Sequence, residues 1–297
     1  MITITKSQYN LCDLVKLSLV LVMKRLIEGL HRFQAGYFES NRALFEQLSQ
    51  GQHPRILFIT CSDSRVDPNL ITQANVGELF VIHNAGNIIP PFNATNGGEG
   101  AAVEYAIAAL GIDQVIVCGH SHCGAMKGLL KMSKLADQMP LVYEWLKQAE
   151  ATRRLLQENY GHVEGEDLVQ IAVAENVLTQ LENLNTYPIV RSRLHQGKLS
   201  LHGWIYSIES GGVLAYDPCR HDFVPLQQQK DIVCNTEYAY NLHSTDSIEA
   251  QNQIYQPIEA STSKPQAKKD SNVTNPNYPG SNRLSPQQAE RIYRGSY

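Results

Sequence analysis

The sequence predicts an α/β fold, in which a central, mostly parallel sheet is flanked by helices, with an N-terminal helical arm and a disordered C-terminal tail. Three short runs of apolar and β-branched residues, 55–60, 79–82 and 114–118, are typical of buried parallel strands. The stretch 99–110 between the last two has helical composition, and the order strand, helix, strand favours a right-handed crossover. With 43% hydrophobic residues, the 297-residue chain has enough apolar material for a sizeable core.

The N-terminal arm is predicted from Met23, where an amphipathic pattern begins. The preceding residues 14–22 faintly resemble the apolar part of a signal peptide, but Asp13 and Lys16 interrupt it and no cleavage site follows. We treat residues 1–22 as an extension that need not be native, with Met23 as an alternative start. No apolar run approaches the roughly 20 residues that a membrane span requires.

The rest of the predicted domain, 23–226, continues with helices at about 124–131, 140–158 and 168–184. Residues 199–209 alternate between polar and apolar types, and Gly211-Gly212 is suited to a turn, so we expect a hairpin or an edge strand there. The formal net charge of −4 gives no basic field that would attract nucleic acid or an anionic membrane.

The C-terminal tail has two predicted parts. The linker 227–283 is expected to be disordered, because its second half, 257–283, contains no Leu, Phe, Met or Trp. Residues 284–297 form a predicted short helix, with Ser285 and Gln288 as a capping box and Gly295 as its end. A short helix on a flexible tether is typical of a peptide ligand, although a frayed terminus without function is the alternative. The residues that share its apolar face are Ala289, Ile292 and Tyr293.

The strongest chemical signal lies at the ends of two predicted strands. Cys61 directly follows one strand, and His120 and Cys123 follow another. The carboxyl ends of parallel strands are where open α/β sheets build their sites. Two thiolates and one imidazole are a zinc ligand set, and three protein ligands leave the fourth tetrahedral position free, as a catalytic zinc requires. Two buried structural cysteines and a core histidine are the alternative.

Asp63 and Arg65 stand two and four residues after Cys61. The carboxylate is suited either to bind the metal itself or to accept a hydrogen bond from water at the site, and Arg65 can hold it with two hydrogen bonds. A surface salt bridge of little value is the alternative for this pair. His122 lies between the two ligands that follow the second strand, and we expect it to be solvated rather than a proton shuttle.

The motifs CSDSRVDP and GHSHCGAM, together with NAGN, GAAVEYA and HGWIY, resemble those of β-class carbonic anhydrases over residues 23–226. This resemblance implies reversible hydration of carbon dioxide to bicarbonate, with one Zn²⁺ per subunit on Cys61, His120 and Cys123. It implies that the pair Asp63 and Arg65 orients and gates the site. It also implies a homodimer or larger oligomer whose substrate pocket crosses the subunit interface.

By motif position, the resemblance implies a substrate pocket formed by Gln52, Phe80, Ala85 and Tyr105, with His83 where an Arg is common. The amide of Gln52 would bind a substrate oxygen and the two aromatic residues would form the wall, although both rings are equally suited to a core. Two other functions stay open. One is a zinc-binding scaffold or sensor that keeps the fold without the activity, and the other is a zinc hydrolase of a related small molecule such as carbon disulfide.

The last ten residues, QAERIYRGSY, and the segment MKRLIEGL from Met23 resemble the cyanobacterial carboxysomal members of this family. This second resemblance implies a cytoplasmic enzyme inside the carboxysome, where it supplies carbon dioxide to Rubisco. It further implies that the tail 284–297 binds a carboxysomal scaffold protein with a γ-carbonic-anhydrase-like domain.

Overall fold

The computed structural model describes residues 11–94 and 97–226, with side chains from residue 21 on, and it divides into two compact units, 1–54 and 55–297. The predicted linker 227–283 and the predicted helix 284–297, with Ala289, Ile292 and Tyr293, lie outside the described residues. Within the two described ranges, each helix is too short or too polar to cross a membrane.

The N-terminal unit is helical, which confirms the predicted arm. Its elements are, in order, α1 (Leu11–Arg32), a π-helical turn (Phe33–Phe38) and α2 (Arg42–Leu48). α1 continues through Met23 without a break, and Leu26 and Leu30 on it are largely exposed. The rings of Phe38 and Phe45, with centroids 4.8 Å apart, pack the π-helical turn against α2.

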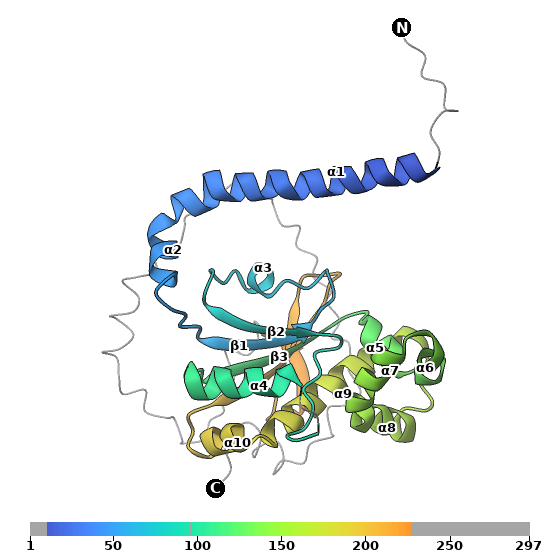
Figure 1. The fold of residues 1–297 in the computed structure, drawn as a ribbon. Coiled ribbons are helices and arrows are strands. Elements are labelled where there is room, and N and C mark those ends of the chain that lie inside the picture. Colours follow the sequence, from blue (N-terminus) through green and yellow to red (C-terminus); the bar gives the residue numbers. More distant parts are fainter. Residues whose placement is uncertain (1–10, 95–96, 227–297) are drawn as a thin grey trace, which may run out of the picture. The chain divides into compact units, whose positions relative to one another are not determined.

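The second unit is built on a sheet with the strand order β2-β1-β3-β4-β5-β6 (Figure 1). The strands are β1 (Ile56–Cys61), β2 (Leu79–Asn84), β3 (Gln114–His120), β4 (Ser200–Tyr206), β5 (Val213–Asp217) and β6 (Asp222–Pro225). The first four run parallel, and β5 and β6 continue the sheet in antiparallel pairs. The three predicted parallel strands are therefore confirmed.

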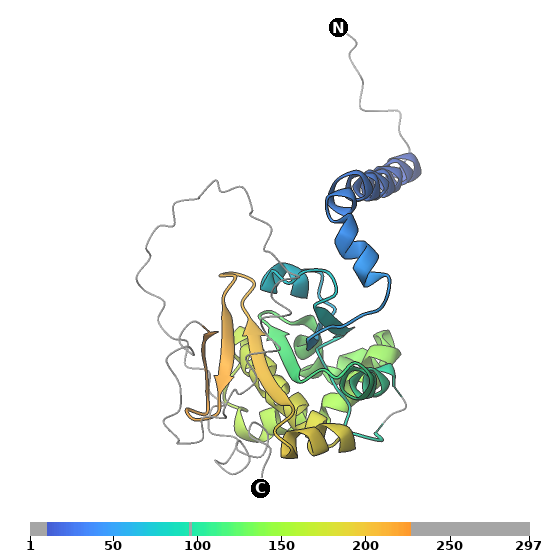
Figure 2. The ribbon, with the colours of Figure 1, turned by 90° about the vertical axis from the view of Figure 1, so that its left-hand side faces the viewer.

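The helices of this unit are α3 (Pro68–Thr72), α4 (Gly98–Glu104) with a π-helical turn (Tyr105–Ala109), α5 (Gly124–Leu129), α6 (Leu135–Gln138), α7 (Pro140–Leu146), α8 (Glu150–Asn159), α9 (Gly165–Asn185) and α10 (Pro188–His195). Figure 1 and the rotated view in Figure 2 show α4, α9 and α10 below the sheet and α3 above it. The predicted flanking of the sheet by helices is confirmed.

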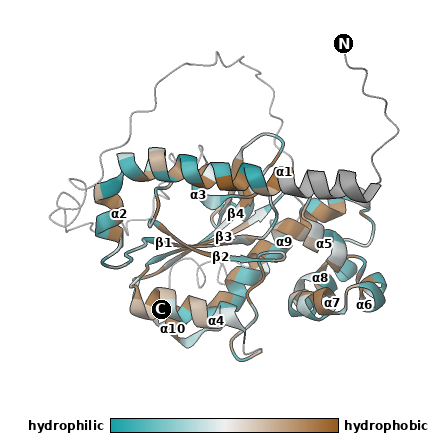
Figure 3. Ribbon diagram, turned by 45° about the horizontal axis from the view of Figure 1, so that its top comes forward, coloured by the Kyte–Doolittle hydropathy of each residue, from teal (hydrophilic) through white to brown (hydrophobic). Residues whose placement is uncertain are grey.

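The core lies between the sheet and α9, and apolar residues are concentrated in the strands and this helix (Figure 3). α9 approaches β3 and β4 at two glycines. A Cβ atom on Gly119 would lie 2.8 Å from Val173, and one on Gly203 would lie 2.9 Å from Val177. Because these positions lack side chains, the helix packs directly on the backbone of the two strands.

The hairpin, one of the two alternatives expected at 199–209, is confirmed and forms between β4 and β5. β4 is an interior strand, since it pairs with β3 on its other side. Its alternating pattern arises because only one of its faces packs on α9. The helix expected at 140–158 is broken by a 3₁₀ turn, Lys147–Ala149, that buries Ala149 in the core. The short helices α3, α6 and α10 and the strand β6 were not predicted.

Candidate metal centre

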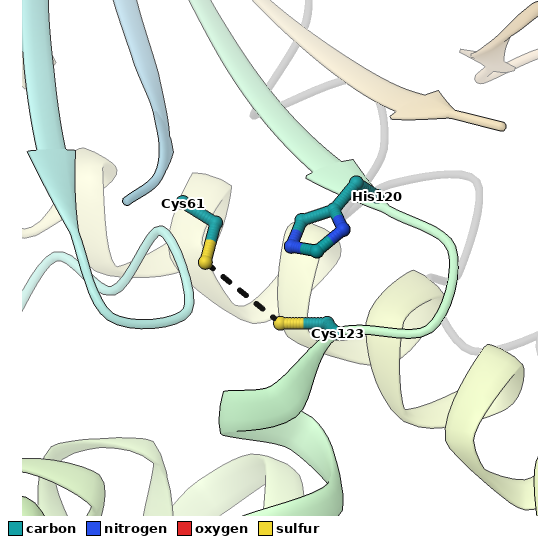
Figure 4. A group of neighbouring side chains, drawn as sticks. All are labelled: Cys61, His120 and Cys123. Atoms are coloured by element: carbon teal, nitrogen blue, oxygen red, sulfur yellow. Dashed lines mark hydrogen bonds between the residues drawn. The ribbon is translucent and has the colours of Figure 1, made fainter. Parts of the chain in front are cut away.

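Three predicted metal ligands converge at the carboxyl ends of neighbouring strands (Figure 4). Cys61 is the last residue of β1 and His120 the last of β3, and these strands pair in parallel. Cys123 is the N-cap residue of α5, three residues later. All three side chains are buried, their potential ligand atoms lie within 4.8 Å of one another, and the two sulfurs are 4.0 Å apart.

The imidazole of His120 is oriented for metal binding. Its Nδ1–H donates to the carbonyl of Ser121 at 2.9 Å, which leaves the lone pair on Nε2. Nε2 is fully buried and has no hydrogen-bond partner in the described part of the chain. An unsatisfied buried acceptor costs about 1–3 kcal/mol. A cation bound between Nε2 and the two sulfurs would remove that cost, so the donor set fits a metal ion.

The two thiols differ in their environments. The sulfur of Cys61 accepts a hydrogen bond from the Cys123 thiol and another, at 3.3 Å, from the backbone N–H of Gly86. The hydrogen bond from Cys123 is the main reason why the pKa of Cys61 is lowered. The same hydrogen bond, together with burial, raises the pKa of Cys123. Cys61 is therefore the thiol of the pair that ionises more readily. Two sulfurs with one imidazole are a typical zinc ligand set.

Asp63 lies beside this cluster and is held by Arg65. Its Oδ1 accepts from the Nε and the backbone N–H of Arg65 at 2.9 and 3.1 Å, and its Oδ2 accepts from Nη2 at 2.8 Å. These bonds hold the pKa of Asp63 well below its usual range. Oδ2 lies 3.9 Å from Nε2 of His120. The carboxylate is thus ionised, fixed in orientation and close to the ligand atoms.

His122 does not lie free in solvent, which corrects our expectation. Its two ring nitrogens contact the carboxylates of Glu166 and Glu209, and its backbone has a φ of +55°, in the left-handed region. Glu209 also accepts from the hydroxyl of Ser121 at 2.8 Å, and Glu166 pairs with Lys127 at 3.0 Å. This network holds the tight turn that carries two of the ligands.

Comparison with known proteins shows which protein family the chain resembles. A family model described as "Carbonic anhydrase" matches residues 56–213. The carbonic anhydrase of Synechocystis sp. is 60% identical over 274 residues, which cover 92% of this chain and the whole of that relative. A solved structure of the β-carbonic anhydrase CcaA is similar, with a TM-score of 0.68 and 72% identity, over 68% of this chain and 98% of that one.

The chain belongs to the β-carbonic anhydrase family. Tetrameric β-carbonic anhydrases from the filamentous ascomycete Sordaria macrospora share the fold at 26% identity, with a TM-score of 0.58 over 65% of this chain and 96% of theirs. The chain is therefore a carbonic anhydrase, which interconverts carbon dioxide and bicarbonate. The predicted family and enzyme class are confirmed.

The aromatic residues expected in the pocket of this β-carbonic anhydrase lie far from the metal ligands of the same chain. Phe80 and Tyr105 contact each other, with ring centroids 6.1 Å apart, and 47% of Tyr105 is exposed. The register pairs Phe80 with Leu57, whereas Cys61 pairs with Asn84. Four residues of strand separate the two positions by about 13 Å. The aromatic pair and the ligands thus occupy opposite ends of the strands.

The other two predicted substrate residues differ in position. Ala85 is exposed and directly follows β2 at the metal end of the sheet, where its carbonyl accepts from Trp145 Nε1 at 2.8 Å. Gln52 belongs to the N-terminal unit, beyond the end of α2. Their roles in substrate binding stay predictions.

Sequence reasoning missed two hydrogen bonds to Cys61. His83 Nδ1 donates to its carbonyl at 3.1 Å, and the backbone N–H of Gly86 donates to its sulfur. A histidine inside the otherwise apolar run of β2 is a signal for the first contact. The hydrogen bond from Gly86 depends on a backbone turn, and apart from the glycine itself no residue in the sequence indicates it.

Proposed function

We propose that this β-carbonic anhydrase uses one Zn²⁺ per subunit, bound by Cys61, His120 and Cys123, and that it works as a homodimer or larger oligomer. The main support is the convergence of two thiols on the buried Nε2 of His120, which has no hydrogen-bond partner among the described residues. We further propose that the enzyme acts in the cytoplasm inside carboxysomes, where it supplies carbon dioxide to Rubisco.

The residues around the cluster suit the hydration reaction. A zinc ion in such a site is a Lewis acid that makes water ionise near neutral pH. Asp63, kept ionised by Arg65, accepts a hydrogen bond from the attacking water and thereby turns its lone pair toward carbon dioxide. Release of Asp63 by Arg65 would free the carboxylate to enter the ligand cluster and close the site.

We propose that Phe80 and Tyr105 line the substrate pocket of a second copy of the chain. Within one chain, about 13 Å of strand separates Phe80 from Cys61, so these rings do not form a wall next to their own metal ligands. The large exposed fraction of Tyr105 supports a partner at this surface. We propose that Gln52 and Ala85 also bind substrate, as their motif positions imply.

The carboxysomal role is supported by the cyanobacterial relative. A match of 274 residues is too long to fit within residues 1–226, so it extends into the C-terminal segment 227–297. The relative therefore shares part of the chain that lies beyond the family match at 56–213. We propose that residues 284–297 bind a carboxysomal scaffold protein through Ala289, Ile292 and Tyr293.

The proposed function is tested by measuring zinc content and carbon dioxide hydration on the full chain. One zinc per subunit together with hydration supports it. Zinc with hydrolysis of carbon disulfide in place of hydration would favour the hydrolase alternative, and zinc with neither reaction would favour a scaffold or sensor.

For the tail, we expect deletion of residues 284–297 to leave zinc content and hydration rate unchanged and to abolish binding to the scaffold protein. A helix of this length is only marginally stable alone, so its apolar face needs a groove on the partner. The double variant Ile292→Asp with Tyr293→Ala should behave like the deletion in a pull-down. The matched control is Ile254→Asp with Tyr255→Ala, the same residue pair in the linker. Equal binding by the truncated and full chains would refute the proposal.

A further inference from the structure

α9 carries a row of polar side chains that hold the loop following β2. Asn176 Nδ2 donates to the carbonyl of Gly86 at 2.9 Å, and Asn183 Nδ2 donates to the carbonyl of Ile89 at 2.9 Å. Between them, Gln180 Oε1 accepts from the backbone N–H of Ile89 at 2.9 Å. These residues recur at a spacing of three or four, so they share one face of the helix. We call Asn176, Gln180 and Asn183 the amide row.

The amide row is a connected and buried network. Gln180 Nε2 donates to Asn176 Oδ1 at 2.9 Å, and Asn183 Nδ2 also donates to Gln180 Oε1 at 3.1 Å. The exposed fractions of Asn176, Gln180 and Asn183 are 1%, 0% and 9%. Because water does not replace a lost partner here, removal of one amide leaves buried groups unsatisfied. The row therefore fixes the loop more firmly than isolated surface contacts would.

The loop held by the amide row provides a hydrogen bond to a metal ligand. Gly86, whose carbonyl bonds to Asn176, donates its N–H to the sulfur of Cys61 at 3.3 Å. Its φ of +86° favours glycine, and an added Cβ would lie 3.0 Å from Ala125 and 3.1 Å from Met126 on α5. The backbone of Gly86 is thus clamped between Asn176 on one side and the helix after Cys123 on the other.

We propose that Asn176 is a positioning residue for the metal centre: by holding the carbonyl of Gly86, it keeps the Gly86 N–H on the Cys61 sulfur and so sets the donor strength of that ligand. The inference rests on the proposed zinc site. Loss of a hydrogen-bond partner of a metal ligand commonly changes metal affinity or activity by roughly 10- to 100-fold. The side-chain hydrogen bonds of Asn176 join it to Gly86 and Gln180 and not to a ligand atom, so its effect on the metal centre passes through Gly86.

The test is Asn176→Leu, which has a similar size but no amide. We expect zinc, measured by competition with a chromophoric chelator, to bind about 10-fold or more weakly than to the wild type. In the Co²⁺-substituted protein, we expect the sulfur-to-cobalt charge-transfer band to shift to lower energy, because loss of the N–H donor raises the energy of the sulfur lone pair. Asn176→Ser leaves room for a bridging water. We expect it to change the zinc affinity and the energy of the charge-transfer band in the same direction as Asn176→Leu, but by smaller amounts.

The control is Thr152→Val. It removes a buried hydrogen bond of 3.0 Å from the hydroxyl of Thr152 on α8 to the hydroxyl of Thr179 on α9, and it leaves the loop after β2 unchanged. We expect this variant to keep the zinc affinity and the cobalt spectrum of the wild type. If Asn176→Leu and Asn176→Ser match this control in both readouts, the positioning role is wrong. Failure of the wild type itself to bind zinc would instead overturn the proposed zinc site, so the two failures are distinguishable.

Discussion

We expect Cys123→Ser to abolish both zinc binding and carbon dioxide hydration. The described residues bring only three candidate ligands together, so the site has no spare donor. A serine hydroxyl does not ionise as a thiol does, and the remaining thiolate and imidazole are too few for a tetrahedral zinc site. Because loss of a hydrogen-bond partner of a ligand alone reduces metal affinity or activity by roughly 10- to 100-fold, loss of a ligand should reduce hydration by more than about 100-fold. Zinc content by elemental analysis and a stopped-flow hydration assay measure both effects.

The matched control is Cys118→Ser, the same change at a fully buried thiol on β3 that is not part of the cluster. Burial raises the pKa of the Cys118 thiol to about 12, so it stays protonated and is no ligand. This control should keep its zinc. Full zinc and turnover in Cys123→Ser would show that the metal site has been assigned wrongly.

We expect Asp63→Asn to retain zinc but to lose roughly 10- to 100-fold in hydration rate. The amide is nearly isosteric, but it carries no charge and accepts hydrogen bonds at only one atom, whereas the carboxylate accepts from Arg65 with both oxygens. The water that attacks carbon dioxide would then lose its oriented acceptor. Zinc content and hydration rate, measured on the same preparation, separate the two effects.

Asp67→Asn is the matched control for this prediction. Asp67 is the N-cap residue of α3 and accepts from the backbone N–H of Leu70 at 3.1 Å. Asparagine caps helices about as well as aspartate, so the control should be close to wild type in both assays. Loss of zinc in Asp63→Asn would contradict the role given to Asp63, because it would make this carboxylate a ligand.

The parallel strands and the ligand set could be predicted because their signals are local. β1 and β3 are continuous apolar runs, and each ends directly in a ligand, Cys61 or His120. Once the strands are known to be parallel, their carboxyl ends must meet, and the geometry of the site follows.

The order of the strands, the surroundings of His122 and the amide row could not be predicted, because they depend on contacts between segments distant in sequence. The pattern of β4 does not show that β3 lies on one side of it and β5 on the other. His122 was expected in solvent because neither Glu166 nor Glu209 is near it in sequence. The amide row on α9 was likewise hidden, since Asn and Gln in a helix usually face water and only the packing of a loop 90 residues away buries them.

The strand register, which places Phe80 and Cys61 at opposite ends of β2 and β1, has a consequence for mixtures of intact and damaged chains. On the proposal that the aromatic pair serves a second copy of the chain, each active centre is formed by two chains, one supplying the metal ligands and the other supplying Phe80 and Tyr105. A chain that has lost Cys123 still supplies Phe80 and Tyr105 to the active centre of its neighbour. Loss of a ligand therefore inactivates the centre of the same chain, whereas loss of Phe80 or Tyr105 inactivates the centre of the partner. In a mixed oligomer of the two kinds of variant, one centre would then have intact ligands and intact aromatic residues and would stay active.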